Sequence, residues 1–256
     1  MNCDSRKLHE ILVLRDGQVV AVIGAGGKHT VMAHLCRELT EFGMTALLTS
    51  TTNLHRIENL SDFSTVRAEA DDEDGGDGMR RLLGLNRSAV VVGADLSANM
   101  FKGIEPQQVQ RLRAALPDAV ILVKADGARK RLLKAPADHE PVYPPTVDLV
   151  ILVLSLAAIG KPFDETHVHR LERVRTLTTG DVIGPGTLVD VIRGPGGYAE
   201  HLPPAARRVL YLSSCTNEAA LADAQLIFQE TKYQFDQQIA ADTLEGMFYQ
   251  AEGKSG

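Results

Sequence analysis

The sequence predicts an α/β protein whose sheet is mostly parallel and flanked by helices. Two observations lead to this prediction: short apolar, β-branched runs recur along the 256 residues, and segments with helical spacing separate them. The apolar runs are continuous rather than alternating, which is typical of strands that are buried on both faces of a parallel sheet. Ligands of such sheets bind beyond the carboxyl ends of the strands, so the polar residues that follow each strand are the candidates for function.

The predicted elements follow one another in a regular order. The first strand spans residues 19–23 and the first helix 30–42. Further strands are expected at 45–48, 89–92, 119–123, 147–154 and 209–212. An acidic, glycine-laden loop at 71–78 precedes a short predicted helix at 79–83, and residues 185–197 form a turn, a brief helix and a second turn. We expect a single domain over 1–256, with a helical C-terminal appendage at about 218–250.

A glycine-rich turn connects the first strand to the first helix. Its residues are Gly24, Ala25, Gly26, Gly27, Lys28, His29 and Thr30. Strand, glycine turn, lysine and helix is the order that binds phosphate, because crowded backbone N–H groups, an ammonium group and the helix dipole act together. The fold is therefore predicted to be P-loop NTPase-like. A Walker A loop needs glycine at Val22 and a hydroxyl at His29, so the spacing is closer to that of Mur-type ligases. The alternative is a turn that needs glycine only for packing.

Hydroxyl and carboxylate groups that could hold Mg²⁺ follow two other strands. Four hydroxyl residues occupy 49–52, and Thr51 and Thr52 among them are candidate metal ligands, together with Thr30. Asp126 follows the strand at 119–123, which is the position of a Walker B carboxylate. The alternatives are strand propensity and turn capping for the hydroxyls, and capping for Asp126.

A basic stretch comes directly after Asp126. It contains Arg129, Lys130, Arg131 and Lys134, and it leads into His139 and Glu140. These two residues lie between two prolines and could serve as acid/base groups or support a metal ligand. Clustered cations in a chain of net charge -6 favour a polyanionic ligand, although a solvated basic loop is the alternative. The pair His167 and His169 has i,i+2 spacing, which disfavours a shared metal on a helix.

The composition excludes several classes of protein. The net charge of -6 argues against general binding to nucleic acid or anionic membranes, and the absence of Trp argues against a base-stacking surface. The three cysteines are widely separated, which disfavours a disulfide framework and a zinc site. The longest apolar stretch is too short to span a bilayer and no export signal is present, so we expect a cytoplasmic protein.

Taken together, these segments resemble the selenium-dependent hydroxylase accessory protein (YqeC) family. The resemblance covers nearly the whole chain, and its most specific part is the run L-K-A-P-A-D-H-E-P-V. The matching segments are 24–30, 49–52, 126–129, 133–142, 160–162 and 168–170. The resemblance implies a P-loop-like protein that acts in the maturation of molybdenum hydroxylases that use selenium. Gly24, Gly26, Gly27, Lys28 and Thr30 match its nucleotide loop, and Asp126, Lys134, His139, Glu140, Lys161, His169 and Arg170 fall on its other motif positions.

The sequence also departs from that family's pattern. His29 replaces a hydroxyl, Lys130 and Leu132 stand where the pattern leans to glycine and proline, and Ala157 stands where an acidic residue is common. Residues 213–217 lack an N-K-x-D-like guanine reader, so ATP and GTP both remain candidates.

Two functions follow from these assignments. The first is a Mg²⁺-dependent nucleotide-using enzyme, in which Lys28 and the loop amides neutralise the β- and γ-phosphates, and Thr30 and Asp126 hold the metal. Arg129, Arg131 and Lys134 then stabilise a second anionic group, and Lys161, His169 and Arg170 add to the cofactor site. The second is a non-catalytic chaperone that carries a nucleotide or a molybdopterin-type cofactor and docks on an apo molybdenum hydroxylase.

Overall fold

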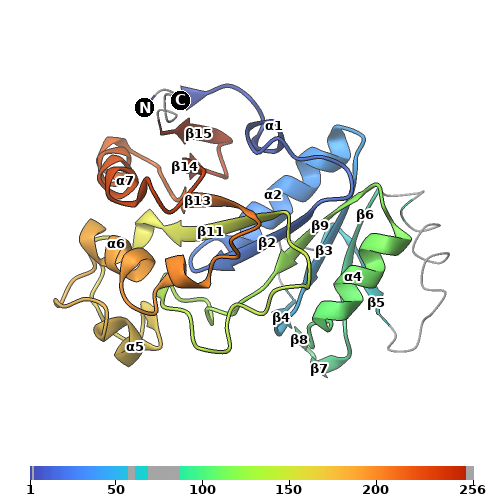
Figure 1. Cartoon of the computed structure of the whole chain (residues 1–256), viewed down its shortest axis with the longest axis horizontal. Coiled ribbons are helices and arrows are strands. Elements are labelled where there is room, and N and C mark those ends of the chain that lie inside the picture. Colours follow the sequence, from blue (N-terminus) through green and yellow to red (C-terminus); the bar gives the residue numbers. More distant parts are fainter. Residues whose placement is uncertain (2, 57–60, 69–82, 84–86, 252–256) are drawn as a thin grey trace.

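A ten-stranded sheet forms the centre of the computed structural model, which describes residues 1, 3–56, 61–68, 83 and 87–251 (Figure 1). In chain order the strands of this sheet are β1 (Cys3–Asp4), β2 (Val19–Gly24), β3 (Thr45–Ser50), β5 (Ser64–Arg67), β6 (Ser88–Val92), β9 (Ala119–Lys124), β11 (Leu149–Ser155), β13 (Arg207–Ser213), β14 (Gln237–Asp242) and β15 (Met247–Gln250). Their order across the sheet is β1-β15-β14-β13-β11-β2-β9-β3-β6-β5.

The sheet is parallel from β5 to β14, and only β15 and β1 run antiparallel to their neighbours. Strands β2, β6, β9 and β11 are buried along their whole length, as the continuous apolar runs require. The predicted α/β class with a mostly parallel sheet is confirmed. Each of the six strands expected from the sequence is present, with ends that differ by no more than two residues.

Helices cover both faces of the sheet, and alternate residues of β2 mark the two sides. Val20 and Val22 pack with α1 (Leu8–Ile11) and α2 (Lys28–Glu41) in one apolar cluster. Ala21 and Ile23 belong to a cluster on the opposite face. That face carries α5 (Leu171–Arg175), α6 (Pro185–Arg193) and α7 (Glu218–Thr231) at one end, and α4 (Pro106–Ala115) at the other (Figure 1). The sheet therefore lies between two helical layers.

Short elements complete the described chain around the carboxyl ends of the strands. A parallel pair consists of β10 (Leu133–Lys134) and β12 (Val168–His169). A small antiparallel sheet consists of β4 (Leu54–His55), β7 (Asp95–Ser97) and β8 (Met100–Phe101). Two 3-10 turns, η2 (Leu156–Ala158) and η3 (Tyr198–His201), follow β11 and α6. These elements surround the edge of the sheet at which β2, β3 and β9 end.

The predicted C-terminal helix is correct only in its first half. Helix α7 begins after Asn217, whose side-chain oxygen accepts a hydrogen bond from the Ala220 N–H, and it ends at Thr231. Residues 237–242 and 247–250 are the strands β14 and β15, not helix. The run Gln237-Gln238-Ile239-Ala240-Ala241 has little β-branching, and β14 is stabilised instead by pairing with β13.

Two sequence predictions fall on residues that the structure does not describe. The acidic loop at 71–78 lies outside the described residues, and so does the predicted helix at 79–83 except for Leu83. In the part of the chain that is described, no helix has the length and apolarity needed to cross a membrane.

Candidate functional site

The glycine turn packs tightly against the neighbouring strands. Gly24 has a φ of 101°, and a Cβ atom there would lie 2.0 Å from the Val153 carbonyl oxygen. Gly26 has a φ of 74°, and a Cβ atom there would lie 2.3 Å from Cβ of Ser155. The Ala25 N–H donates to the Val153 oxygen at 2.9 Å. Packing alone therefore requires glycine at 24 and 26, as the alternative interpretation of the turn holds.

The end of the same turn leaves backbone donors for a ligand. Gly27 is the N-cap residue of α2 and provides no side-chain cap. The first N–H groups of an α-helix have no acceptor within the helix. They lie at the positive end of the helix dipole, which favours an anion at this position. The turn therefore has the donors of a phosphate site in its second half, around residues 26–29, rather than along its whole length.

Asp126 lies beneath this turn and holds two lysines. Its Oδ1 atom is 2.7 Å from the Lys28 Nζ, and its Oδ2 atom is 2.9 Å from the Lys134 Nζ. Oδ2 also accepts a hydrogen bond from the Gly24 N–H at 2.9 Å. Asp126 and Lys134 are fully buried, and Lys28 is 4% exposed. The predicted proximity of Lys28 and Asp126 is thus present.

The ion pairs continue from Lys134 toward the surface. Glu140 accepts from the Lys134 Nζ at 2.7 Å and from the Arg170 guanidinium at 2.6 Å. On the other side, the buried Tyr198 hydroxyl donates to Asp126 at 3.4 Å. The network thus connects the glycine turn, the segment that follows β9, and the start of α5.

Both carboxylates of this network are ionised at neutral pH. Burial by itself raises the pKa of Asp126, but the Lys28 and Lys134 ammonium groups outweigh it and lower that pKa to about 2. Burial likewise raises the pKa of Glu140, while Arg170 and Lys134 lower it to about 2. The two carboxylates therefore pair with Lys28, Lys134 and Arg170, while burial lowers the pKa of Lys28 against the opposing effect of Asp126.

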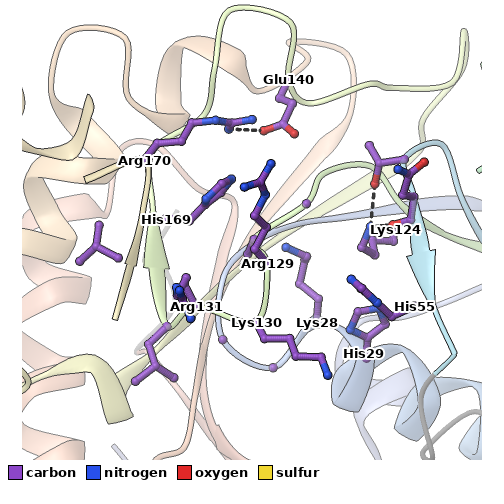
Figure 2. Close-up of a pocket in the computed structure, with 18 of the residues that line it drawn as sticks. Lys28, His29, His55, Lys124, Arg129, Lys130, Arg131, Glu140, His169 and Arg170 are labelled. Carbon is purple, nitrogen blue, oxygen red and sulfur yellow. Dashed lines mark hydrogen bonds and ion pairs between the residues drawn. The ribbon is translucent and has the colours of Figure 1, made fainter. Parts of the chain in front are cut away.

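A large cavity opens above the network, at the carboxyl ends of β2, β3 and β9 (Figure 2). Its volume is about 1180 Å³. The described residues that line it include seven basic side chains and three glutamates. The basic residues are Lys28, Lys124, Arg129, Lys130, Arg131, Arg170 and Arg173, and the glutamates are Glu140, Glu165 and Glu172. The basic side chains outnumber the glutamates, so the wall favours an anionic ligand.

Lys124 is a lining residue that the sequence analysis did not single out. It is the last residue of β9 and is 4% exposed. Burial, together with the charge of Lys28, lowers its pKa to about 7. Figure 2 shows His29 and His55 on the same side of the cavity as Lys124. Burial also lowers the pKa of His29 to about 3, so this ring is neutral at pH 7. The sequence signal was the lysine at the end of an otherwise apolar strand.

The structure brings most of the predicted site residues to this cavity. Those that line it are Gly26, Gly27, Lys28, His29, Thr52, Arg129, Arg131, Glu140, His169 and Arg170. Asp126 and Lys134 lie directly behind the wall, and Gly24 and Ala25 are buried in the turn. Four further predicted residues are likewise not among the described lining residues, namely Thr30, Thr51, His139 and Lys161. His139 and Lys161 are exposed.

The predicted magnesium ligands do not fit a metal in this arrangement. Both oxygens of Asp126 are engaged by lysines. The Thr51 hydroxyl donates to the Val142 carbonyl at 2.6 Å, and Thr52 Oγ1 accepts from the Lys124 Nζ at the same distance. No cluster of three or more His, Cys, Asp or Glu side chains suited to a metal occurs in the described part of the chain. Mg²⁺ needs free oxygen ligands, and Asp126, Thr51 and Thr52 do not offer them together.

Comparison with known proteins adds the family. The family model described as "YqeC protein" matches residues 20–172, which include the glycine turn, the ion-pair network and the start of α5. A protein of Escherichia coli (strain K12), described as "Uncharacterized protein YqeC", is 30% identical over 217 residues. That alignment covers 82% of this chain and 81% of the relative. This chain belongs to the YqeC family.

Among solved structures, chloroplast FtsY from Physcomitrella patens is a distant match to this YqeC-family chain. It has a TM-score of 0.41 and 12% sequence identity. The alignment covers 90% of this chain and 61% of that chain, so the present chain spans less than two thirds of the FtsY structure.

Three basic residues of the cavity in this YqeC-family protein have a left-handed backbone. The φ angles are 47° for Arg129, 61° for Lys130 and 58° for Arg170. This conformation costs a side-chain-bearing residue roughly 1–2 kcal/mol. Glycine, which the family resemblance leads us to expect at position 130, would adopt this conformation without that cost. Strained residues gather where a function needs the side chain, and all three line the cavity.

Proposed function

We propose that this YqeC-family protein binds the polyphosphate of a nucleoside triphosphate in the basic cavity and uses it in the maturation of molybdenum hydroxylases. The observation that carries the proposal is the position of the cavity: seven basic side chains and the N-terminus of α2 line it together, at the carboxyl ends of the central strands. That edge of a parallel sheet is where nucleotides bind.

The charges support a polyanion rather than a single carboxylate. Asp126 and Glu140 compensate Lys28, Lys134 and Arg170 within the protein. The remaining basic residues of the wall belong largely to the loop that holds Arg129, Lys130 and Arg131, and this loop lines the cavity together with the end of the glycine turn. Arginine pairs with phosphate through two parallel hydrogen bonds, so this loop suits phosphate oxygens.

The size of the cavity supports more than one ligand. Pockets for a single small molecule usually occupy roughly 300–1000 Å³. The cavity here is larger, at about 1180 Å³. A nucleotide with a second anionic substrate would therefore fit, as phosphoryl or nucleotidyl transfer requires. In that reaction Lys28 and the N–H groups at 26–29 would stabilise the transferred phosphate, and the arginines would position the acceptor.

The role in molybdenum hydroxylase maturation, including the use of selenium, rests on the family resemblance of the motif segments. A molybdopterin-type cofactor carries a phosphate of its own, which is the chemistry that a second anionic subsite would recognise. The apo-hydroxylase is the corresponding protein partner.

A second candidate function is a carrier that binds the nucleotide or the pterin cofactor without turnover. The observation that favours it is the engagement of both predicted catalytic carboxylates, Asp126 and Glu140, by buried cations. The cations lower the pKa of each carboxylate to about 2, so each is a weak base at neutral pH and would serve as an anchor rather than as a general base.

Calorimetry and turnover assays separate these functions. Titration with ATP, GTP, CTP and molybdopterin identifies the ligand, and release of phosphate or pyrophosphate reports turnover. Lys28→Ala should abolish binding, while Lys102→Ala should not, because Lys102 is exposed and pairs with Glu105 away from the cavity. Turnover without a partner protein supports the enzyme. Binding without turnover, even with an apo-hydroxylase present, supports the carrier, and an absence of binding rejects both.

A further inference from the structure

The ammonium group of Lys124 lies in a cage of uncharged oxygens at the end of β9. Its Nζ atom donates to Thr52 Oγ1 at 2.6 Å, to the Asn53 carbonyl at 3.0 Å and to Ser50 Oγ at 3.3 Å. The side chain is 4% exposed and lines the cavity. Hydroxyl and carbonyl oxygens are also the ligands that proteins offer to hard cations. The ammonium group is therefore surrounded by the kinds of oxygen atoms that could hold a metal cation, at the end of the strand that precedes Asp126.

The partners of Lys124 differ from those of the other buried cations. Lys28 and Lys134 pair with Asp126, and Arg170 pairs with Glu140. No ion pair of Lys124 occurs within the described residues, where each of its hydrogen bonds ends on a neutral oxygen. A buried charge without a counter-charge costs free energy. An anion in the cavity would supply the missing partner.

His29, on the same side of the cavity as Lys124, has a ring nitrogen without a hydrogen-bond partner among the described residues. This atom, Nε2, is buried. His29 lines the same cavity and follows Lys28 at the start of α2. His29 stands where a Walker A loop would place its metal-binding hydroxyl, so the chain has an imidazole and an ammonium on this side of the cavity, where the sequence predicted metal ligands.

We propose that the Lys124 ammonium, held by Thr52, Asn53 and Ser50, replaces Mg²⁺ as the counter-charge for a phosphate group of the bound ligand. This inference rests on the proposed function, and it goes further by making polyphosphate binding independent of added divalent cations. It also assigns the Thr52 hydroxyl as a positioning group for the lysine, not as a metal ligand. The ligand class is a polyphosphate or a phosphate monoester that enters without its metal.

Calorimetry with ATP and with pyrophosphate, each in EDTA and in excess Mg²⁺, tests the inference. For the wild-type protein we expect the same affinity in both conditions, within about threefold. Lys124→Met keeps the apolar stem and removes the charge, so it should weaken binding in EDTA roughly ten- to a hundredfold, because the phosphate loses a positive charge a few ångströms away at an effective dielectric constant of about 20. Lys102→Met is the matched control and should bind as the wild type does, since Lys102 lies outside the cavity wall.

Competition between the two probes identifies the source of the phosphate. Pyrophosphate that competes with ATP assigns Lys124 to the nucleotide, and pyrophosphate that binds the ATP-saturated protein assigns it to a second substrate. Either result retains the inference if Lys124→Met weakens pyrophosphate binding.

Two results would overturn the inference while the proposed function stands. One is ATP binding by the wild type that needs Mg²⁺, and the other is equal binding in EDTA by the wild type and Lys124→Met. Circular dichroism checks that the variant folds. If it does not, the wild-type comparison still decides, and Thr52→Val, which removes one oxygen of the cage, should weaken binding in EDTA. No binding of either probe in either condition would reject the proposed function as well.

Discussion

The Lys28 ammonium lies 2.7 Å from Oδ1 of Asp126, with both side chains buried beneath the glycine turn. The lysine that the sequence predicts for phosphate binding is thus compensated inside the protein before any ligand arrives. Asp126 also binds Lys134, so one carboxylate fixes two ammonium groups that would otherwise repel each other. The aspartate therefore acts as an anchor for the wall of the cavity.

Removing that anchor should destabilise the fold. Asp126→Asn leaves Lys28 and Lys134 buried with a neutral partner, and loss of one member of a buried pair costs roughly 3–5 kcal/mol. Urea denaturation followed by circular dichroism measures the free energy of unfolding. Asp138→Asn is the control: Asp138 is exposed and pairs with Arg173 at 2.7 Å, so its loss should cost less than about 1 kcal/mol. Equal stability of Asp126→Asn and the wild type would contradict the anchor role.

The central strands could be predicted because their residues leave little choice. Runs such as Val19–Gly24 and Ala119–Lys124 are buried along their length, so apolarity alone locates them. Strand β14 could not be found in this way, because its two glutamines and two alanines fit a helix equally well. Its strand conformation comes from pairing with β13 on one side and β15 on the other.

Some residues of the candidate site could likewise be predicted from the sequence, and others could not. Lys28 and Asp126 could be predicted, because each follows a strand that ends at the same edge of the sheet. His139 and Lys161 belong to recognisable motifs, yet both are exposed and lie outside the described cavity wall. Tyr198 has no motif around it, and its contact with Asp126 depends on how η3 packs. Spacing along a chain predicts where a strand ends, but not the direction in which a loop turns afterwards.

The stability of the α1–α2 contact should fall in acid. Burial raises the pKa of Glu38, but the His34 ring and the N–H groups of His9 and Leu8 lower it to about 2. Because this pKa is below its ordinary value of 4.5, the carboxylate stabilises the fold above about pH 4.5, and the contribution is lost as pH falls toward 2. This lowering of the Glu38 pKa corresponds to about 3 kcal/mol of unfolding free energy. Urea midpoints measured from pH 2 to pH 6 should show this slope.

The variant Glu38→Gln tests the assignment of that slope to one residue. It should be less stable than the wild type at pH 6 and should approach it in acid, since both then carry a neutral side chain. Glu41→Gln is the matched control on the same helix, because Glu41 is exposed. A slope that persists in Glu38→Gln would show that another group titrates.

Gly26 and Gly160 illustrate two different reasons why a position requires glycine, namely a steric clash and a left-handed backbone. Both have positive φ angles, 74° and 81°. A Cβ atom on Gly26 would lie 2.3 Å from Cβ of Ser155, whereas one on Gly160 would meet nothing within 4 Å. Gly160→Ala should therefore cost about 1–2 kcal/mol from backbone strain alone. Gly26→Ala should cost distinctly more and should also weaken ATP binding, because the turn must move. Equal unfolding free energies for the two variants would mean that the clash relaxes without cost.

Lys130 combines backbone strain with a charge that faces the ligand, so stability and binding should change in opposite directions. Its φ is 61°, and it lines the cavity between two arginines in sequence. Lys130→Gly relieves the strain and should raise the free energy of unfolding by about 1 kcal/mol. The same change removes a cation from the cavity and should weaken ATP binding. Lys130→Met keeps the strain and removes the charge, so it should weaken binding equally without the gain in stability. If Lys130→Gly bound ATP as tightly as the wild type, the lysine would have no part in the site, and its strain would need another explanation.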